Sequence, residues 1–220
     1  MKLNKITIPK TANYYISGNK TNSIKNVWFV CHGYGQLAKF FIRNFNRLDK
    51  EENYIIAPEG LHRFYLNGFS GRVGASWMTK EEREDDIKDY NNFLKMVLKK
   101  ELSEINFEKV NINLLGFSQG TTTISRFLFL NDIQADNLIL WAGDLPNDID
   151  YEKVKKFSQS NSIYFVTGNN DEFISLENFE AIIEKHEKEG IRISKIVFNG
   201  KHKIINEALV ELQNKMHVEK

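Results

Sequence analysis

The 220-residue chain has almost no cysteine and almost no net charge, and both absences limit what it can do. Its one cysteine, Cys31, excludes an internal disulfide and a cysteine-based zinc site, and it agrees with a reducing, cytoplasmic location. The 30 Lys and Arg residues nearly balance the 29 Asp and Glu residues, which leaves a formal charge of +1. A chain this neutral is not expected to bind nucleic acid or acidic lipid through its surface charge.

Long apolar runs are also missing. The longest, such as residues 27–31, have five residues, whereas a membrane-spanning helix requires about 20, so no membrane span is expected. Residues 1–10 lack the apolar stretch of a secretory signal. Apolar residues still make up 41% of the chain, and no repeat or Gly/Pro-rich linker divides it. We therefore expect one domain over residues 1–220.

Short β-branched or aromatic runs alternate with segments of helical spacing along the chain. The predicted strands cover residues 14–17, 27–31, 54–57, 110–115, 137–141, 162–167 and 191–198. The predicted helices cover residues 37–49, 80–100, 119–131, 151–159, 176–189 and 203–215. This alternation indicates an α/β fold with a mostly parallel sheet, helices on both faces and a ligand site beyond the carboxyl ends of the strands. Thr79 and Glu82 have the spacing of a capping box and predict the start of the second helix.

Residues 116–120, Gly-Phe-Ser-Gln-Gly, follow a predicted strand and precede a predicted helix, as in a nucleophile elbow. The two glycines allow strand and helix to approach closely while Ser118 occupies a strained turn with its hydroxyl exposed. The alternative for Ser118 is an ordinary helix N-cap. A similar run at residues 68–72 lacks the second glycine at the right place and follows no clear strand, so Ser70 is predicted to lie in a loop.

A serine nucleophile needs a base to take its proton and a carboxylate to orient that base. In chain order both follow the serine, each at the end of a later strand. His202 after residues 191–198 and Asp171 after residues 162–167 fit these positions, and they are our predicted base and acid. Asp144, after residues 137–141, is the alternative acid. Glu172, next to Asp171, is expected to point elsewhere.

The other four histidines receive no catalytic role. His32 and His62 precede the serine in the chain, which is the wrong order. His186 lies in a predicted helix and His217 in the terminal segment, and both are expected to be solvated surface residues. Cys31 is expected to be a buried structural thiol.

The oxyanion that forms during attack on an ester carbonyl needs fixed hydrogen-bond donors. The backbone N–H of Gln119, at the start of the helix after the serine, is the first predicted donor. The second comes from residues 32–36, His-Gly-Tyr-Gly-Gln, which follow an early strand. We assign it to the N–H of Tyr34, with that of Gly35 as the competitor.

Residues 32–36, residues 116–120, Asp171 and His202 together resemble the small α/β-hydrolases of the phospholipase/carboxylesterase family, which includes acyl-protein thioesterases and bacterial carboxylesterases. Residues 57–60 and Ser76-Trp77 resemble the early loop and the tryptophan motif of that family. The likeness spans about residues 27–215. This resemblance implies an α/β-hydrolase fold. It also implies an enzyme that acts on esters or thioesters of modest acyl groups without a metal or an organic cofactor.

The chain also departs from the family pattern. Gln36 stands where the family often has aspartate, Thr121 where it often has glycine, and residues 172–174 replace a small aliphatic and proline pattern. The chain is too short for a lid domain, so the site should be open, with the loop at residues 61–78 as its cover. We expect an acyl or alcohol pocket lined by aromatic residues, unless these only anchor the loop. The candidates are Phe64, Tyr65, Phe69, Trp77 and, beyond the loop, Phe173.

These residues predict a serine hydrolase that cleaves carboxylic (thio)esters through an acyl-enzyme. We favour a carboxylesterase for short to medium acyl chains. Its binding partner would be its substrate, a small-molecule or lipid acyl ester. The alternatives are an acyl-protein thioesterase or lysophospholipase, and a non-catalytic ligand receptor on the same scaffold. No sequence feature specifies an oligomeric state.

Overall fold

The computed structural model describes residues 1–103, 105 and 110–218. A central sheet of seven strands has the order β1-β3-β2-β6-β7-β8-β9. The strands are β1 (Tyr14–Ser17), β2 (Asn26–Cys31), β3 (Asn53–Pro58), β6 (Asn111–Phe117), β7 (Asn137–Trp141), β8 (Ser162–Gly168) and β9 (Ser194–Phe198). β1 runs antiparallel to β3 and every other pair is parallel. The mostly parallel sheet predicted from the sequence is confirmed.

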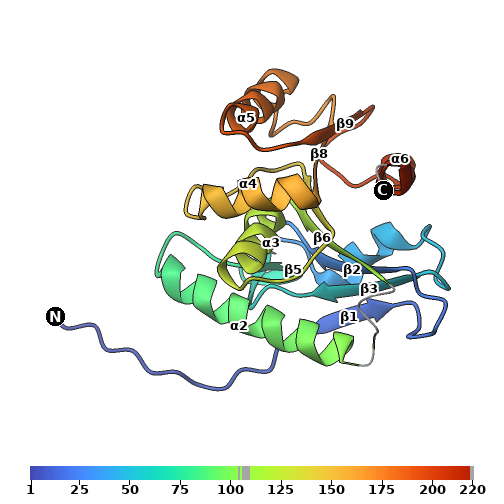
Figure 1. The fold of residues 1–220 in the computed structure, drawn as a ribbon. Coiled ribbons are helices and arrows are strands. Elements are labelled where there is room, and N and C mark those ends of the chain that lie inside the picture. Colours follow the sequence, from blue (N-terminus) through green and yellow to red (C-terminus); the bar gives the residue numbers. More distant parts are fainter. Residues whose placement is uncertain (104, 106–109, 219–220) are drawn as a thin grey trace.

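Helices cover both faces of this sheet (Figure 1). They are α1 (Ala38–Phe41), η1 (Ile42–Phe45), α2 (Arg83–Leu102), α3 (Gln119–Leu130), α4 (Tyr151–Ser160), α5 (Leu176–Lys188) and α6 (Asn206–Val218). One apolar core packs α2, α3, α4 and α5 against the sheet, and a second packs α1, η1 and α6 on the other face. Both faces of the central strands are therefore buried.

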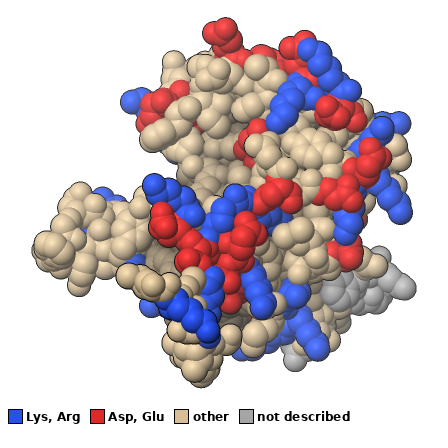
Figure 2. Space-filling view, turned by 90° about the vertical axis from the view of Figure 1, so that its left-hand side faces the viewer, with Lys and Arg blue, Asp and Glu red and all other residues tan. Residues whose placement is uncertain are grey.

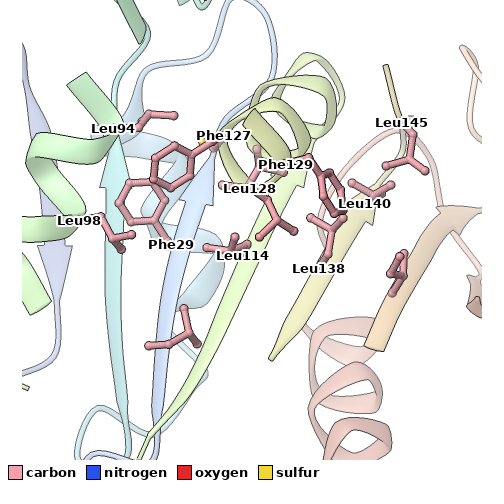
Figure 3. Packing of buried hydrophobic residues seen from close by; sticks show 14 of the residues in the cluster. Phe29, Leu94, Leu98, Leu114, Phe127, Leu128, Phe129, Leu138, Leu140 and Leu145 are labelled. Atoms are coloured by element: carbon pink, nitrogen blue, oxygen red, sulfur yellow. The ribbon is translucent and has the colours of Figure 1, made fainter. Parts of the chain in front are cut away.

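The period of two along each strand divides its side chains between the two cores. In β2, Phe29 belongs to the core under α2 and α3, whereas its neighbours Trp28 and Val30 belong to the core under α1 and η1. Figure 3 shows the first core, where the ring of Phe29 stacks on that of Phe127 from α3 with 5.4 Å between centroids. A strand buried on both faces is continuously apolar, which is why the sequence shows it so clearly.

Three predicted helices differ from the structure. The last begins at Asn206, three residues later than predicted. The second helix begins at Arg83, and the capping box is wrong, because Glu82 has a left-handed φ of 49° and no side chain caps the helix. The backbone N–H of Thr79 instead donates to Asp86 Oδ2 at 3.1 Å. The helix predicted over residues 37–49 is only α1 followed by the 3₁₀ turn η1. There the side chain of Asn44 donates to the carbonyl of Phe41 at 2.9 Å and competes with regular helical bonding.

The segment predicted as a loop over residues 61–78 is largely a β-hairpin. Its strands are β4 (His62–Asn67) and β5 (Ser70–Ser76), which pair antiparallel. The prediction for Ser70 is wrong as well, because this residue is the first of β5. Side chains alternate between half-buried and exposed along β4, so the hairpin has one face on the protein and one in solvent. It is therefore an ordered cover beside residues 33–36.

Charged side chains of both signs are interleaved on the face of the molecule that Figure 2 shows. No patch of one sign dominates this face. Within residues 1–103, 105 and 110–218, no helix is both long and apolar enough to cross a membrane.

Candidate active site

The strand, turn and helix predicted around Ser118 are present. β6 ends at Phe117, Ser118 has φ 53° and ψ −119°, and α3 begins at Gln119. A positive φ is strained for any residue with a Cβ, and such strain is typical of functional turns. A Cβ on Gly116 would lie 2.2 Å from the carbonyl oxygen of Gly120, so strand and helix are too close for another residue. The side chain of Ser118 makes no cap hydrogen bond, which argues against the N-cap alternative.

Asp171 and His202 lie together beyond the ends of β8 and β9. Asp171 Oδ2 is 2.7 Å from His202 Nδ1, while its Oδ1 accepts the backbone N–H groups of Phe173 at 2.8 Å and Ile174 at 3.0 Å. The side chain of Asp171 is fully buried and that of His202 is 13% exposed. With Nδ1–H donated to the carboxylate, Nε2 of His202 keeps its lone pair free to accept a proton.

Aromatic rings connect this pair with the elbow. The ring of His202 lies 4.9 Å from that of Phe117, the residue before Ser118, and 4.6 Å from that of Phe173. Ser118 Oγ makes no hydrogen bond with any residue that the structure describes. The contact between Ser118 and His202 therefore stays a prediction.

Glu172 does not point away as expected. Its Oε2 accepts the backbone N–H of His202 at 3.2 Å, so the side chain holds the loop that carries the imidazole. Hydrogen bonds from its own backbone N–H and from that of His202 lower the pKa of this carboxyl. Glu172 does not contact the imidazole itself, so the orienting acid is still assigned to Asp171.

The prediction that His186 is a solvated surface residue is wrong. Its side chain is fully buried, and its Nε2 lies 2.6 Å from Oδ1 of Asp144, the alternative acid. Asp144 is thus engaged away from His202. His62 is partly exposed and pairs with Asp86 at 3.0 Å, while the side chain of His217 lies outside the described residues.

Residues 33–36 lie beside the elbow, because a Cβ on Gly33 would be 3.2 Å from that of Ser118. Within this loop the N–H of Gly33 donates to the side chain of Gln36 at 2.9 Å, and the N–H of Gly35 donates to the carbonyl of Ala75 in β5 at 2.9 Å. Tyr34 N–H has no acceptor among the described residues, so the geometry favours it over Gly35 as the oxyanion donor.

Two further contacts, both made by Glu59 next to this loop, were not foreseen. Oε1 of the buried Glu59 accepts Arg63 Nε at 2.8 Å, and its Oε2 accepts the backbone N–H of Ala38 at 3.2 Å. The motif at residues 57–60 indicated the family resemblance but no role for this carboxylate. Arg63 is only four residues away in the chain, but the contact with Ala38, 21 residues away, depends on tertiary structure.

His32 is fully buried behind the loop. Its Nε2 accepts the N–H of Gly60 at 2.9 Å, and its Nδ1 lies 2.8 Å from the carbonyl oxygen of Gly33. Both contacts are satisfied by a neutral ring with the proton on Nδ1. Burial lowers the pKa of His32 from 6.5 to about 4.

His32 should make stability depend on pH. Because the folded state disfavours protonation of this ring, the unfolded chain binds more protons between the unfolded pKa of 6.5 and the folded pKa of about 4. The contribution of His32 to the free energy of unfolding is fully present above pH 6.5, and it is lost as the pH falls toward about 4. We expect a loss of about 2 kcal/mol in unfolding free energy between about pH 7 and pH 4.5 from this residue.

Urea unfolding of the wild type and of His32→Gln at both pH values measures this effect. The variant cannot titrate, so its unfolding free energy should fall less over this range, while carboxylates contribute equally to both proteins. Equal pH slopes would show that His32 binds protons as readily in the folded protein as in the unfolded chain.

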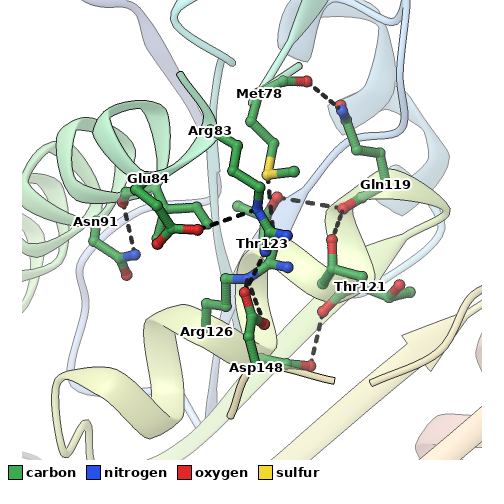
Figure 4. Close-up of polar contacts among 12 residues, drawn as sticks. Met78, Arg83, Glu84, Asn91, Gln119, Thr121, Thr123, Arg126 and Asp148 are labelled. Atoms are coloured by element: carbon green, nitrogen blue, oxygen red, sulfur yellow. Dashed lines mark hydrogen bonds and ion pairs between the residues drawn. The ribbon is translucent and has the colours of Figure 1, made fainter. Parts of the chain in front are cut away.

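The side chain of Gln119 was missed as a structural contact. Figure 4 shows it reaching from the start of α3 to Met78, whose carbonyl oxygen accepts its Nε2–H at 2.9 Å, while its Oε1 accepts the N–H of Trp77 at 3.2 Å. Farther along α3, Arg126 pairs with Asp148 at 3.0 Å. The two hydrogen bonds of the Gln119 side chain fix the elbow to the segment that follows β5.

The three predicted substrate-binding aromatics have different surroundings. Trp77 is fully buried, donates from Nε1 to the carbonyl of His32 at 2.8 Å and packs on its ring, so it supports the loop and has no surface for substrate. This corrects its assignment to the pocket. Phe173 is 74% exposed beside His202, and Phe69 is 98% exposed at the turn of the hairpin. Both stay predictions.

Burial raises the pKa of the Cys31 thiol and makes it unsuitable as a nucleophile. Among the described residues, no three His, Cys, Asp or Glu side chains converge as a metal ion would need.

The sheet order, the flanking helices and the strained serine turn after β6 define the chain as an α/β-hydrolase. A sequence model of the Phospholipase/Carboxylesterase family matches residues 16–219, and the chain belongs to this family. Membership supports a hydrolase of the carboxylesterase or thioesterase type. No match was found among curated proteins.

Solved structures share the fold at low sequence identity. A carboxylesterase from Bacillus cereus has a TM-score of 0.66 at 16% identity, over 94% of each chain. Acyl-protein thioesterase 2 from Zea mays has a TM-score of 0.70 at 14% identity, over 94% of this chain and 99% of that one. A phospholipase/carboxylesterase from Dyadobacter fermentans has a TM-score of 0.65 at 20% identity, over 96% and 99%.

Proposed function

We propose that this protein is a serine hydrolase that cleaves carboxylic esters of short to medium acyl chains through an acyl-enzyme. The observation that carries the proposal is the buried Asp171 beside His202, joined through Phe117 to the strained turn at Ser118. Burying a carboxylate is costly unless it is paired and hydrogen-bonded, and the bonds that Asp171 makes also fix the orientation of the imidazole.

In the proposed reaction, Ser118 Oγ attacks the acyl carbon while its proton passes to His202 Nε2. The N–H groups of Tyr34 and Gln119 hold the carbonyl oxygen as it becomes negative. His202 then protonates the leaving alcohol or thiol, and the acyl group stays on Ser118. Water, deprotonated by His202, attacks that ester, and His202 then gives this proton to Ser118 Oγ as the acid leaves. Asp171 accepts the hydrogen bond of the imidazolium throughout.

Two other functions have support. The similarity to the maize acyl-protein thioesterase favours a thioesterase or lysophospholipase as the first alternative. The exposed Phe69 and Phe173 offer apolar contact for a longer acyl chain. A non-catalytic receptor is the second alternative, but a receptor would not need a strained serine or an oriented histidine.

Hydrolysis of p-nitrophenyl esters from acetate to palmitate, with labelling by a serine-directed fluorophosphonate, tests the proposal. We expect stoichiometric labelling at Ser118 and a kcat/KM that is highest for chains of about two to eight carbons, because the described residues form no lid domain that would enclose a longer one. An optimum at palmitate would favour the lipid or protein deacylase. The absence of both labelling and hydrolysis would favour the receptor.

Two further proposals concern the domain organisation and the location of the protein. We propose that residues 1–220 form one domain. One sheet contains both the first strand, β1, and the last, β9, and supports this proposal. We also propose a cytoplasmic location, which is supported by the single, buried thiol of Cys31.

A further inference from the structure

A second Asp–His pair lies behind the elbow, and the reaction proposed above does not use it. Asp144 follows β7, and His186 lies near the end of α5, 42 residues away. The imidazole is fully buried between the rings of Tyr151 and Phe165, each 5.7 Å from its centroid. Its Nδ1 has no partner among the described residues. A leucine or phenylalanine would fill this position without leaving a buried nitrogen unpaired.

Asp144 belongs to a short segment that supports the nucleophile. The backbone N–H of Ser118 donates to the carbonyl of Trp141 at 2.8 Å. Gly143 lies so close to the elbow that a Cβ there would be 2.3 Å from Thr121 Oγ1 and 2.9 Å from the carbonyl oxygen of Ser118. A displacement of residues 141–144 would therefore move the turn that presents the serine hydroxyl.

This segment is itself strained. Ala142 has a left-handed φ of 52°, which is strained for a residue with a Cβ, so surrounding contacts must hold it. Its N–H donates to the carbonyl of Val166 in β8 at 2.7 Å. The other anchor is Asp144 Oδ1, which accepts the N–H of Leu145 at 2.6 Å and lies 2.6 Å from His186 Nε2.

The helix that carries His186 also begins behind the proposed acid. α5 starts at Leu176, and the loop before it supplies the N–H groups of Phe173 and Ile174 to Asp171. The start of α5 thus borders the Asp171–His202 pair, and its end reaches residues 141–144, the segment that supports Ser118. The contact between Asp144 and His186 is the buried polar link at that end, where the exposed Lys185 Nζ also donates to Asn147 Oδ1 at 3.4 Å.

We propose that Asp144 and His186 are a positioning pair that holds residues 141–144 against the Ser118 elbow. Neither residue takes part in proton transfer to substrate. The pair fixes the serine turn relative to the helix behind the acid, and so it affects the rate of acylation more than the binding of substrate. This inference rests on the proposed function for its kinetic readout, but the geometry can be tested without catalysis.

Three variants distinguish an effect on the position of the serine turn from an effect on the stability of the protein. His186→Leu removes the donor, while His186→Gln keeps an N–H near the place of Nε2. The double variant Asp144→Asn/His186→Leu removes the donor without leaving an unpaired carboxylate, and its amide oxygen still accepts the N–H of Leu145. Tyr151→Phe, which keeps the ring beside His186, is the matched control.

The first readout is the rate at which the fluorophosphonate phosphonylates Ser118, together with the rate of p-nitrophenyl ester turnover. We expect His186→Leu and the double variant to lose about tenfold or more in kcat with KM within about threefold, because the serine is displaced but the pocket is intact. His186→Gln and Tyr151→Phe should stay within about threefold of wild type. If the double variant melts like the wild type and also reacts at the wild-type rate, the positioning role is wrong.

Hydrogen exchange at the amides of Ser118 and Ala142 is the second readout, and it needs no activity. We expect exchange about tenfold faster or more in His186→Leu and in the double variant, with amides of β2 unaffected. Unchanged exchange at both amides would overturn the inference. If the wild type neither reacts with the fluorophosphonate nor cleaves any ester, the proposed function fails, whereas the exchange result still decides whether the pair holds the turn.

Discussion

Ser118→Ala should lower kcat/KM for p-nitrophenyl butyrate by about 10⁴-fold or more, and fluorophosphonate labelling should disappear. Alanine keeps the Cβ and the packing of the elbow but removes the atom that attacks the ester. A positive φ is as strained for alanine as for serine, so the free energy of unfolding should change little. The measurement is steady-state hydrolysis together with thermal unfolding of both proteins.

Ser70→Ala is the matched control for this experiment. Ser70 also follows a Gly-Phe pair, but it is exposed at the start of β5 and has an ordinary strand environment. Its removal should leave kcat/KM within about twofold, since it contacts no proposed catalytic group. Equal residual activity in Ser118→Ala and wild type would mean that another group attacks the ester.

The sequence predicts the sheet and the elbow because both depend on local features. β2, β7 and β8 are buried on both faces and read as continuous apolar runs, and their bounds match to within about one residue. At the elbow, Gly116 and Gly120 are required by backbone contacts within a five-residue segment. Local sequence therefore carries the information for these elements.

Three errors have a different origin. His186 has glutamates and lysines as chain neighbours, so nothing local indicates that its ring is buried against Asp144, which is distant in the chain. The hairpin of β4 and β5 is half-exposed, and its side chains alternate too weakly to distinguish it from an aromatic loop. The capping box at Thr79 fails because Asp86 binds the backbone of Thr79. In each case a partner brought near by folding decides the structure.

Asp171→Asn should lower kcat by about 10⁴-fold, and the hydrogen bonds of the carboxylate explain why. Asp171 Oδ1 accepts the N–H groups of Phe173 and Ile174, so the amide oxygen of the asparagine must occupy that place. Its NH₂ group then faces His202 Nδ1, where Oδ2 now stands. Two donors cannot share this contact, so the imidazole proton moves to Nε2. In that tautomer Nε2 cannot take the proton of Ser118.

Asp144→Asn tests the same substitution at the alternative acid and should cost less than about tenfold. Asp144 Oδ1 accepts the N–H of Leu145 and faces His186 Nε2, and an amide oxygen can replace it in both contacts. The two variants are compared by kcat for one ester and by the ¹⁵N shifts of the His202 ring, which distinguish its tautomers. A large loss in Asp144→Asn with little loss in Asp171→Asn would transfer the orienting role to the loop after β7. A loss in Asp171→Asn without a change of tautomer would mean that the carboxylate charge, and not the position of the proton, is what His202 requires.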